Sequence, residues 1–164
     1  MKEEELSFAN RLKVNFIKPY LRKEDRIIDL GCGSMWLTKY LRSQGFNCTA
    51  FDSTPPADIV GDIKHYPFKE SSYDTAIAFE MIEHVDCIDE IKHILKPGGL
   101  LLVTTPVPHF DFVCKILECL SISQKRTSPH SNLLYLEDIP MKLVEKKVLF
   151  GLCQCGALRN EEKV

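Results

Sequence analysis

RIIDLGCGSMWLTKYL, residues 26–41, holds the pattern on which the architecture of the chain depends. It begins with an apolar pair and an acid, Ile27-Ile28-Asp29, which predict a buried strand of a parallel sheet. Gly31 and Gly33 follow, and glycines one residue apart predict a sharp turn with close approach to the backbone. Apolar side chains then recur at helical spacing, at Trp36, Leu37, Tyr40 and Leu41. Strand, turn and helix are typical of a nucleotide-type binding unit, although an ordinary strand-to-helix turn shows the same pattern.

The composition fits one domain with a full hydrophobic core. The chain has 164 residues, 45% of them hydrophobic, with 21 Lys plus Arg against 23 Asp plus Glu. This balance argues against a nucleic-acid or anionic membrane partner. No apolar run approaches the roughly 20 residues that span a bilayer. Since the first residues lack the apolar core of a signal peptide, we expect a cytoplasmic protein.

Seven cysteines are scattered along the chain. Without a signal peptide, reduced thiols are expected rather than a disulfide framework. Cys153 and Cys155 would share one face of a strand, which favours a core or sheet role over zinc binding. We therefore predict no metal site.

Strand and helix signals alternate on both sides of the glycine turn. Residues 6–21 carry a helical stripe that includes Phe8 and Phe16 and predict a helix, either packed on the sheet edge or acting as a lid. Strands are predicted at 46–51, 57–61, 74–79 and 100–105, and a short helix at 89–95. The segment after Asp52 is too short and proline-rich for the usual crossover helix. These elements predict an α/β fold, a doubly wound, mostly parallel Rossmann-like sheet with helices on both faces.

The last third of the chain has a looser pattern. We predict a helix at 110–120, a loop at 121–132 and a helix at 136–146 interrupted by Pro140. A shortened terminal strand pair is predicted at 148–152 and 153–158.

From about residue 26 to 106 the chain resembles the class I S-adenosylmethionine-dependent methyltransferases, in particular their small-molecule branch. The segments that carry the resemblance occur in the family's order: Asp29-Leu30-Gly31-Cys32-Gly33-Ser34, Phe51-Asp52, Gly61-Asp62-Ile63, Tyr73-Asp74 through Glu83-His84-Val85, and Leu95-Lys96-Pro97-Gly98-Gly99. The resemblance implies one domain, 1–164, with an N-terminal helix in 1–22, a cofactor-binding core in 26–106 and a substrate-covering part in 107–164.

The resemblance also implies a cofactor, S-adenosylmethionine, with S-adenosylhomocysteine as product. By it, Asp52 binds the ribose hydroxyls, Asp62 the adenine amino group, and Ile63 lies against the ring. The carbonyl of Phe79 is expected to hold the methionine ammonium. The full set of implied cofactor-binding residues is Asp29, Gly31, Cys32, Gly33, Asp52, Ser53, Asp62, Ile63 and Phe79.

Met35 is a departure, because the family usually has a third glycine there. A methionine side chain at this position is expected to crowd the cofactor or displace the helix. The resemblance as a whole makes a methyltransferase acting on a small molecule the leading hypothesis. The alternative is a non-catalytic cofactor-binding or partner protein with the same fold.

Spacing alone identifies no catalytic residue, but candidates lie near the expected methyl group. A base is required only if the acceptor must lose a proton. Glu80 leaves the fourth strand closest to the methyl, and Glu83 and His84 follow on the next turn. His84 is also explained as a structural histidine that braces loops. His130, like His109, falls in the segment that is expected to cover the acceptor.

Overall fold

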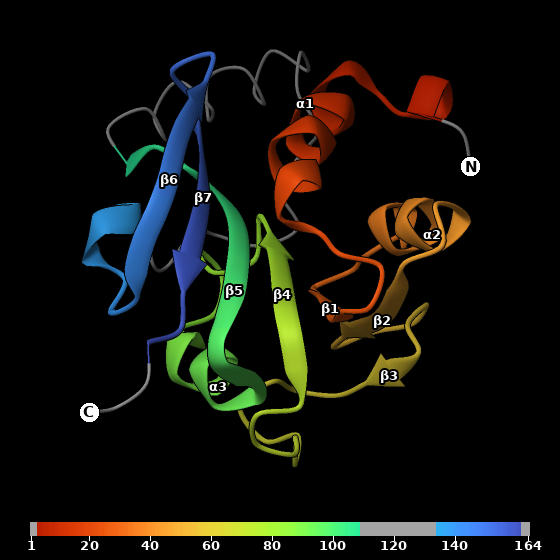
Figure 1. Cartoon of the computed structure of the whole chain (residues 1–164), viewed down its shortest axis with the longest axis vertical. Helices are drawn as coiled ribbons and strands as arrows, with labels where there is room; N and C mark the ends of the chain where they lie inside the picture. The colour runs from red at the N-terminus through yellow and green to blue at the C-terminus, as the bar shows by residue number, and fades with distance from the viewer. Residues whose placement is uncertain (1–2, 109–133, 162–164) are drawn as a thin grey trace.

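A computed structural model describes residues 3–108 and 134–161. Its centre is one sheet of seven strands (Figure 1): β1 Arg26–Leu30, β2 Asn47–Asp52, β3 Ile59–Val60, β4 Tyr73–Phe79, β5 Leu95–Pro106, β6 Lys142–Leu149 and β7 Cys153–Arg159. The strand order is β3-β2-β1-β4-β5-β7-β6. The first five strands pair in parallel and β7 is antiparallel to both of its neighbours. The predicted mostly parallel, doubly wound sheet is confirmed.

Helices cover both faces of the sheet. The helices α1 Phe8–Ile17 and α2 Trp36–Ser43 pack on one face, and α3 Ile88–Ile94 packs on the other. Short 3₁₀ turns complete the described elements: η1 Glu3–Glu5, η2 Lys18–Tyr20 and η4 Leu136–Asp138. Because strands β1, β4 and β5 are buried on both faces, they have near-continuous apolar sequences rather than alternating ones.

The glycine turn lies where the winding of the sheet reverses. Leu30, the last residue of β1, pairs with Phe51 of β2 on one side and with Ala78 of β4 on the other. The chain runs outward from β1 in both directions, so the crevice at the carboxyl ends of β1, β2 and β4 is the switch point at which such sheets bind ligands. As expected, no helix follows β2 in the described residues, and a series of bends over 53–58 leads into β3.

The prediction for residues 136–146 was wrong. Only the short turn η4 forms there, and after Pro140 the chain enters strand β6. The terminal strands are also longer than the predicted 148–152 and 153–158, because β6 pairs along the whole of β7. Lys146 and Lys147 suit an exposed edge strand, and strand pairing outweighs the local helical pattern. The predicted helix at 110–120 and loop at 121–132 lie outside the described residues.

The N-terminal helix buries Phe16 and Ile17 of its predicted stripe but not Phe8. Phe8 is 60% exposed and contacts Phe150, whereas Val14, outside the predicted stripe, is buried. Among the described residues, no helix is long and apolar enough to cross a membrane.

Candidate functional site

The glycine turn curls over the end of β2. The amides of Gly31 and Cys32 both donate to the carbonyl of Phe51, at 2.9 and 3.1 Å. Gly31 has φ +68° and a Cβ there would lie 3.0 Å from Cγ of Met81. Gly33 has φ +50°, and apart from its chain neighbours no heavy atom of the described residues lies within 4 Å of where its Cβ would be. The turn therefore leaves space beside Gly33 for the close approach that the sequence predicted.

Asp52 is held at the rim of this space by two backbone amides. The Gly33 amide donates to its Oδ2 at 2.8 Å, and the Thr54 amide donates to its Oδ1 at 3.0 Å. The hydroxyls of Ser53 and Thr54 make longer contacts with Oδ1, at 3.4 and 3.3 Å. Oδ2 accepts only from the Gly33 amide among the described residues, so one of its two lone-pair sites is left to accept from a hydroxyl of a diol. The residues at the turn thus fit the ribose of a nucleoside cofactor.

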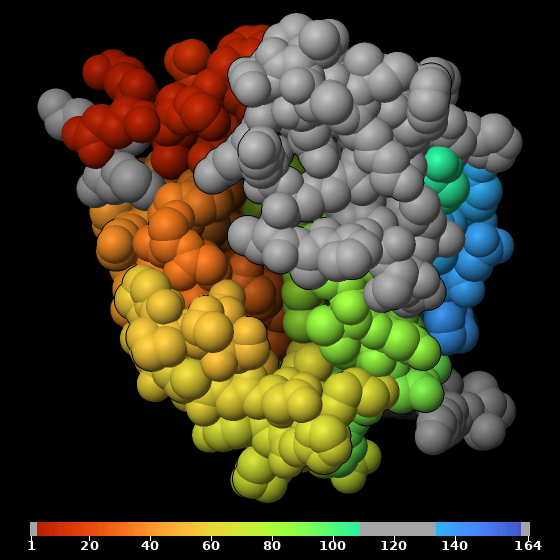
Figure 2. All heavy atoms as spheres, turned by 180° about the vertical axis from the view of Figure 1, so that it is seen from behind, coloured from red at the N-terminus to blue at the C-terminus, as the bar shows by residue number. Residues whose placement is uncertain are grey.

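Asp62 and Ile63 follow the neighbouring strand β3. Asp62 is exposed and accepts from the Lys64 amide at 3.0 Å and from Nδ1 of His65 at 2.8 Å, and these partners lower its pKa. The Gly61 amide donates to the carbonyl of Asp52, which joins the two acidic segments. Ile63 is only 5% exposed, within the core under α3. Figure 2 shows this part of the chain (yellow) next to the segment with the glycine turn and α2 (orange).

Asp29 and Cys32 are predicted cofactor residues that lie deeper. Asp29 is 3% exposed, and its Oδ2 accepts from the Thr38 hydroxyl on α2 at 2.6 Å. Burial raises the pKa of Asp29 to about 6, although the bond from Thr38 opposes the shift. The buried Cys32 thiol donates to the Pro56 carbonyl at 3.5 Å, and burial raises its pKa to about 11. Both side chains join the turn to neighbouring elements.

Phe79, which ends β4, and Glu80, which follows it, lie at the other side of the switch point. The ring of Phe79 stacks on Trp36 from α2, with centroids 6.3 Å apart. Glu80 follows with φ +53°, and its amide donates to the carbonyl of Thr104 at 2.9 Å. Its Oε1 lies 2.6 Å from Nζ of Lys13 on α1.

Sequence reasoning did not identify Lys13 as part of the site. It lies three and four residues before Phe16 and Ile17 and so shares their helical face. All three side chains are buried, Lys13 at 9% exposed. A cation on the apolar face of the helix was the signal that could have found it.

Glu83 is the most unusual of the acids after β4. It is 1% exposed, and its Oε2 has no hydrogen-bond partner in the described part of the chain. Burial is the main cause that raises its pKa to about 7. The nearby Glu80 carboxylate adds to the increase, whereas the Thr105 hydroxyl and Lys13 lower the pKa.

Of the candidate histidines, His84 alone falls within the described residues. His84 is half-buried, and its amide donates to the carbonyl of Met81 at 2.9 Å. His130 and His109 lie outside the described residues. Within the ranges 3–108 and 134–161, no three His, Cys, Asp or Glu side chains are grouped so as to hold a metal. Cys153 and Cys155 are free thiols on β7.

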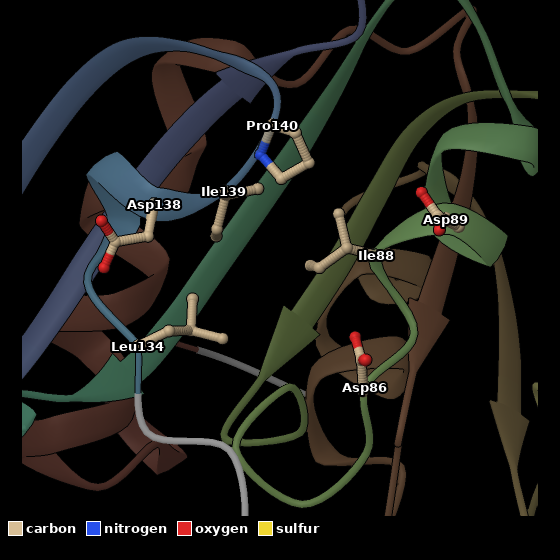
Figure 3. Close-up of a pocket in the computed structure, with 7 residues that line it drawn as sticks. All are labelled: Asp86, Ile88, Asp89, Leu134, Asp138, Ile139 and Pro140. Atoms are coloured by element: carbon tan, nitrogen blue, oxygen red, sulfur yellow. The ribbon is translucent and has the colours of Figure 1, made fainter.

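A separate pocket of about 210 Å³ opens between the start of α3 and the segment around η4 (Figure 3). Its lining residues are Asp86, Ile88, Asp89, Leu134, Asp138, Ile139 and Pro140. The apolar side chains point into the space and the carboxylates flank it. None of the predicted cofactor residues lines it, so it is distinct from the glycine turn.

Comparisons with curated proteins give relatives over about half of the chain. The ubiquinone biosynthesis O-methyltransferase of Xylella fastidiosa is 31% identical over 101 residues, covering 49% of this chain and 41% of the relative. That of Rickettsia typhi is 32% identical over 100 residues, covering 49% of this chain and 40% of the relative. The matching part of this chain therefore spans about two fifths of the length of these relatives.

Solved structures share the fold over nearly the whole chain. A SAM-dependent methyltransferase of Methanosarcina mazei has a TM-score of 0.64 at 18% identity, covering 90% of this chain and 98% of that one. A second neighbour is the 1,6-didemethyltoxoflavin-N1-methyltransferase of Burkholderia thailandensis, solved with 1,6-didemethyltoxoflavin and S-adenosylhomocysteine. It has a TM-score of 0.67 at 14% identity, covering 94% of this chain and 79% of that one. Residues 3–148 match the family described as the methyltransferase domain. The chain belongs to this methyltransferase family, which confirms the resemblance drawn from its sequence.

Proposed function

We propose that the protein transfers a methyl group from S-adenosylmethionine to a small-molecule acceptor and releases S-adenosylhomocysteine. The observation that supports this most directly is the 2.8 Å hydrogen bond from the Gly33 amide to Asp52. It holds a carboxylate beside the open space at Gly33, at the switch point of the sheet. A nucleoside with a vicinal diol and no phosphate is the ligand that this arrangement suits.

Three of the predicted residues then have a role toward this cofactor. The remaining lone-pair site on Oδ2 of Asp52 accepts from a ribose hydroxyl, and exposed Asp62 accepts from the adenine amino group. The carbonyl of Phe79 receives the methionine ammonium. The sulfonium supplies a methyl group with a good leaving group already in place. Positioning by these residues can therefore supply most of the rate acceleration.

A small acceptor is supported by two observations. The relatives in Xylella and Rickettsia are O-methyltransferases of ubiquinone biosynthesis, and a structural neighbour is an N-methyltransferase solved with a small heterocycle. We propose that the protein works in the cytoplasm without nucleic acid, as its balanced charge suggests.

Met35 favours the second candidate function, a cofactor-binding protein without turnover. It has φ +61°, the left-handed conformation that glycine adopts without strain. Replacement of glycine here places a long side chain at the start of α2. Binding of the cofactor without methyl transfer to any acceptor, together with stable association with an active enzyme, would support this alternative.

The proposed function is tested by calorimetric titration with S-adenosylhomocysteine and by thermal unfolding with S-adenosylmethionine or NAD. We expect stabilisation by S-adenosylmethionine only, of about 2.7 kcal/mol at a concentration of 100 Kd. Asp52→Ala should weaken binding at least tenfold. Asp58→Ala is the matched control, because Asp58 accepts from the Ala50 amide at 2.6 Å and pairs with Arg42, and among the described residues it makes no hydrogen bond to the glycine turn.

Asp58→Ala should lower thermal stability but keep the affinity of the wild type. If the wild-type protein binds neither S-adenosylmethionine nor S-adenosylhomocysteine, the proposed function is wrong. Methyl transfer itself is measured by mass spectrometry of acceptor panels. Binding with no transfer to any acceptor selects the non-catalytic alternative.

A further inference from the structure

A second cavity lies on the side of the sheet that α1 and α2 cover (Figure 1). Its volume is about 210 Å³, and its walls come from α1, η2, the segment that leads into β1, and the end of α2 with the residues that follow it. A cavity of about 150 Å³ is enough to hold benzene. None of the predicted cofactor residues lines this second cavity, which lies at the end of α2 away from the glycine turn.

Most of the wall of this cavity is apolar. Val14 and Leu41 are each 1% exposed and belong to the core under these helices, and Leu21 and Phe46 pack against that core. A buried water molecule needs about two to four polar partners, so an apolar space of this size suits a hydrocarbon better than ordered water. The body of a complementary ligand is therefore an apolar chain or ring.

The charges at the cavity are positive. Two exposed lysines, Lys18 and Lys23, line it, and among the described residues no Asp or Glu does. Nζ of Lys23 lies 3.6 Å from the centroid of the Phe46 ring and donates to the carbonyl of Gln44. Since cations without lining acids attract negative charge, the polar end of a complementary ligand is an anion.

A carboxylate of the protein itself shows where such an anion is held. Oε2 of Glu3, on η1, accepts from Nζ of Lys18 at 3.1 Å and from the hydroxyl of Tyr40 at 3.4 Å. Tyr40 is 2% exposed, so its hydroxyl is held in place by a buried ring. The Tyr40 contact is longer than the usual O–H···O distance of about 2.7–2.8 Å, which leaves room for a closer acceptor. Glu3 does not line the cavity, whose apolar space stays open beside this carboxylate.

We propose that this cavity binds a small apolar monocarboxylate. Its carboxylate takes the place of Glu3 between Lys18 and Tyr40, and its hydrocarbon body fills the space beside Leu21 and Leu41. Helix α2 has 8 residues and is therefore about 12 Å long, which separates this site from the glycine turn. Binding at the cavity is independent of the proposed function.

The probe is 3-phenylpropionate, and calorimetric titration measures its affinity. The neutral 3-phenylpropionamide has the same shape and should bind at least tenfold more weakly, because it lacks the charge that Lys18 pairs with. A wild-type protein that does not bind 3-phenylpropionate at millimolar concentration, or that binds the amide equally well, overturns the proposal.

Glu3→Gln tests whether the ligand competes with the carboxylate of the protein. This substitution should tighten binding of 3-phenylpropionate by about two- to fivefold, the range expected for release of an exposed ion pair. Glu4→Gln is the matched control, because Glu4 lies on the same turn, is exposed and makes no hydrogen bond or ion pair within the described residues. Equal effects of the two substitutions would show that only the net charge matters and overturn the competition.

Tyr40→Phe tests the buried hydroxyl. Loss of its hydrogen bond should weaken binding of 3-phenylpropionate by about three- to tenfold. Tyr20→Phe is the control, since the Tyr20 hydroxyl donates to Glu145 and does not line the cavity, and its affinity should match the wild type. Unchanged affinity in Tyr40→Phe would remove Tyr40 from the site.

Nuclear magnetic resonance of methyl-labelled protein identifies the cavity that is used. The ring protons of bound 3-phenylpropionate should show contacts with the methyl groups of Leu21 and Leu41. Contacts with Ile88 and Ile139 instead would place the ligand in the pocket of Figure 3 and overturn the proposal. Either result leaves the cofactor assignment intact, because titration with S-adenosylhomocysteine tests that assignment separately.

Discussion

Nζ of Lys13 on α1 lies 2.6 Å from Oε1 of Glu80, the first residue after β4. The lysine is mostly buried, with 11% of its side chain exposed, whereas the side chain of Glu80 is 58% exposed. The same ammonium lies 5.8 Å from the centroid of the Phe79 ring. This ion pair connects the N-terminal helix to the edge of the sheet where the cofactor is proposed to bind.

Lys13→Ala is predicted to lower the free energy of unfolding by about 1–2 kcal/mol. The substitution leaves Glu80 without its cation and removes the buried alkyl chain, but the exposure of Glu80 keeps the loss below that of a fully buried pair. Lys18→Ala is the control, since Lys18 pairs with Glu3 in solvent and should cost less than about 0.5 kcal/mol. Urea unfolding measures both. Equal losses would show that the Lys13 pair contributes no more than a surface pair.

Gly33→Ala and Gly45→Ala are predicted to differ in ligand binding but not in stability. Both glycines have positive φ, +50° and +82°, so alanine costs about 1–2 kcal/mol at either position. Only the methyl group at Gly33 enters the space proposed for the cofactor. Calorimetry should show at least a tenfold loss of S-adenosylhomocysteine affinity for Gly33→Ala and none for Gly45→Ala. Unchanged affinity in both variants would place the ligand elsewhere.

Met35→Gly is predicted to be more stable than Met35→Ala by about 1–2 kcal/mol. Both variants remove the long side chain, but only glycine relieves the left-handed backbone at φ +61°. Chemical denaturation of the two variants isolates the backbone contribution. If the methionine side chain crowds the cofactor, both variants also bind S-adenosylhomocysteine more tightly than the wild type does.

Asp29→Asn is predicted to change the pH dependence of stability. The pKa of Asp29 in the folded protein is about 6, above its ordinary value of 3.8, so the folded state binds the proton more tightly. The stabilisation by protonation is complete below pH 3.8 and is lost as the pH rises to about 6, which amounts to about 3 kcal/mol. Relative to wild type, the asparagine variant should therefore gain stability between pH 4 and pH 7.

Asp74→Asn is the opposite control for this pH series. The Lys96 ammonium and the Arg26 amide lower the pKa of Asp74, so its stabilisation is present at neutral pH and lost in acid. This variant should lose stability at pH 7 and approach the wild type as the pH falls. Unfolding curves from pH 4 to pH 8 that show the same slope for both variants would contradict the assignment for Asp29.

Local patterns predicted the cofactor half of the fold well. Ile27 and Ile28 form a buried strand, and Leu37, Tyr40 and Leu41 pack as one helical stripe, because periodicity within one element reports which face is apolar. The position of Asp52 at a strand end placed it beside Gly33, since parallel strands end at one edge of the sheet. Residues 136–146 were assigned wrongly because strand pairing decides their conformation. β6 pairs with β7, and β7 in turn pairs with β5, which is distant in sequence.

The sequence by itself determined the strand–turn–helix unit and the order of the parallel strands along the chain. It also determined which acids lie at the ends of β2 and β3. These features depend on neighbouring residues and on where each strand ends. Tertiary structure alone decided the burial of Lys13 against Glu80 and the burial of Glu83 beside Thr105. Those groups come from separate elements, and their ionisation and unused hydrogen bonds depend on the removal of water when the elements pack together.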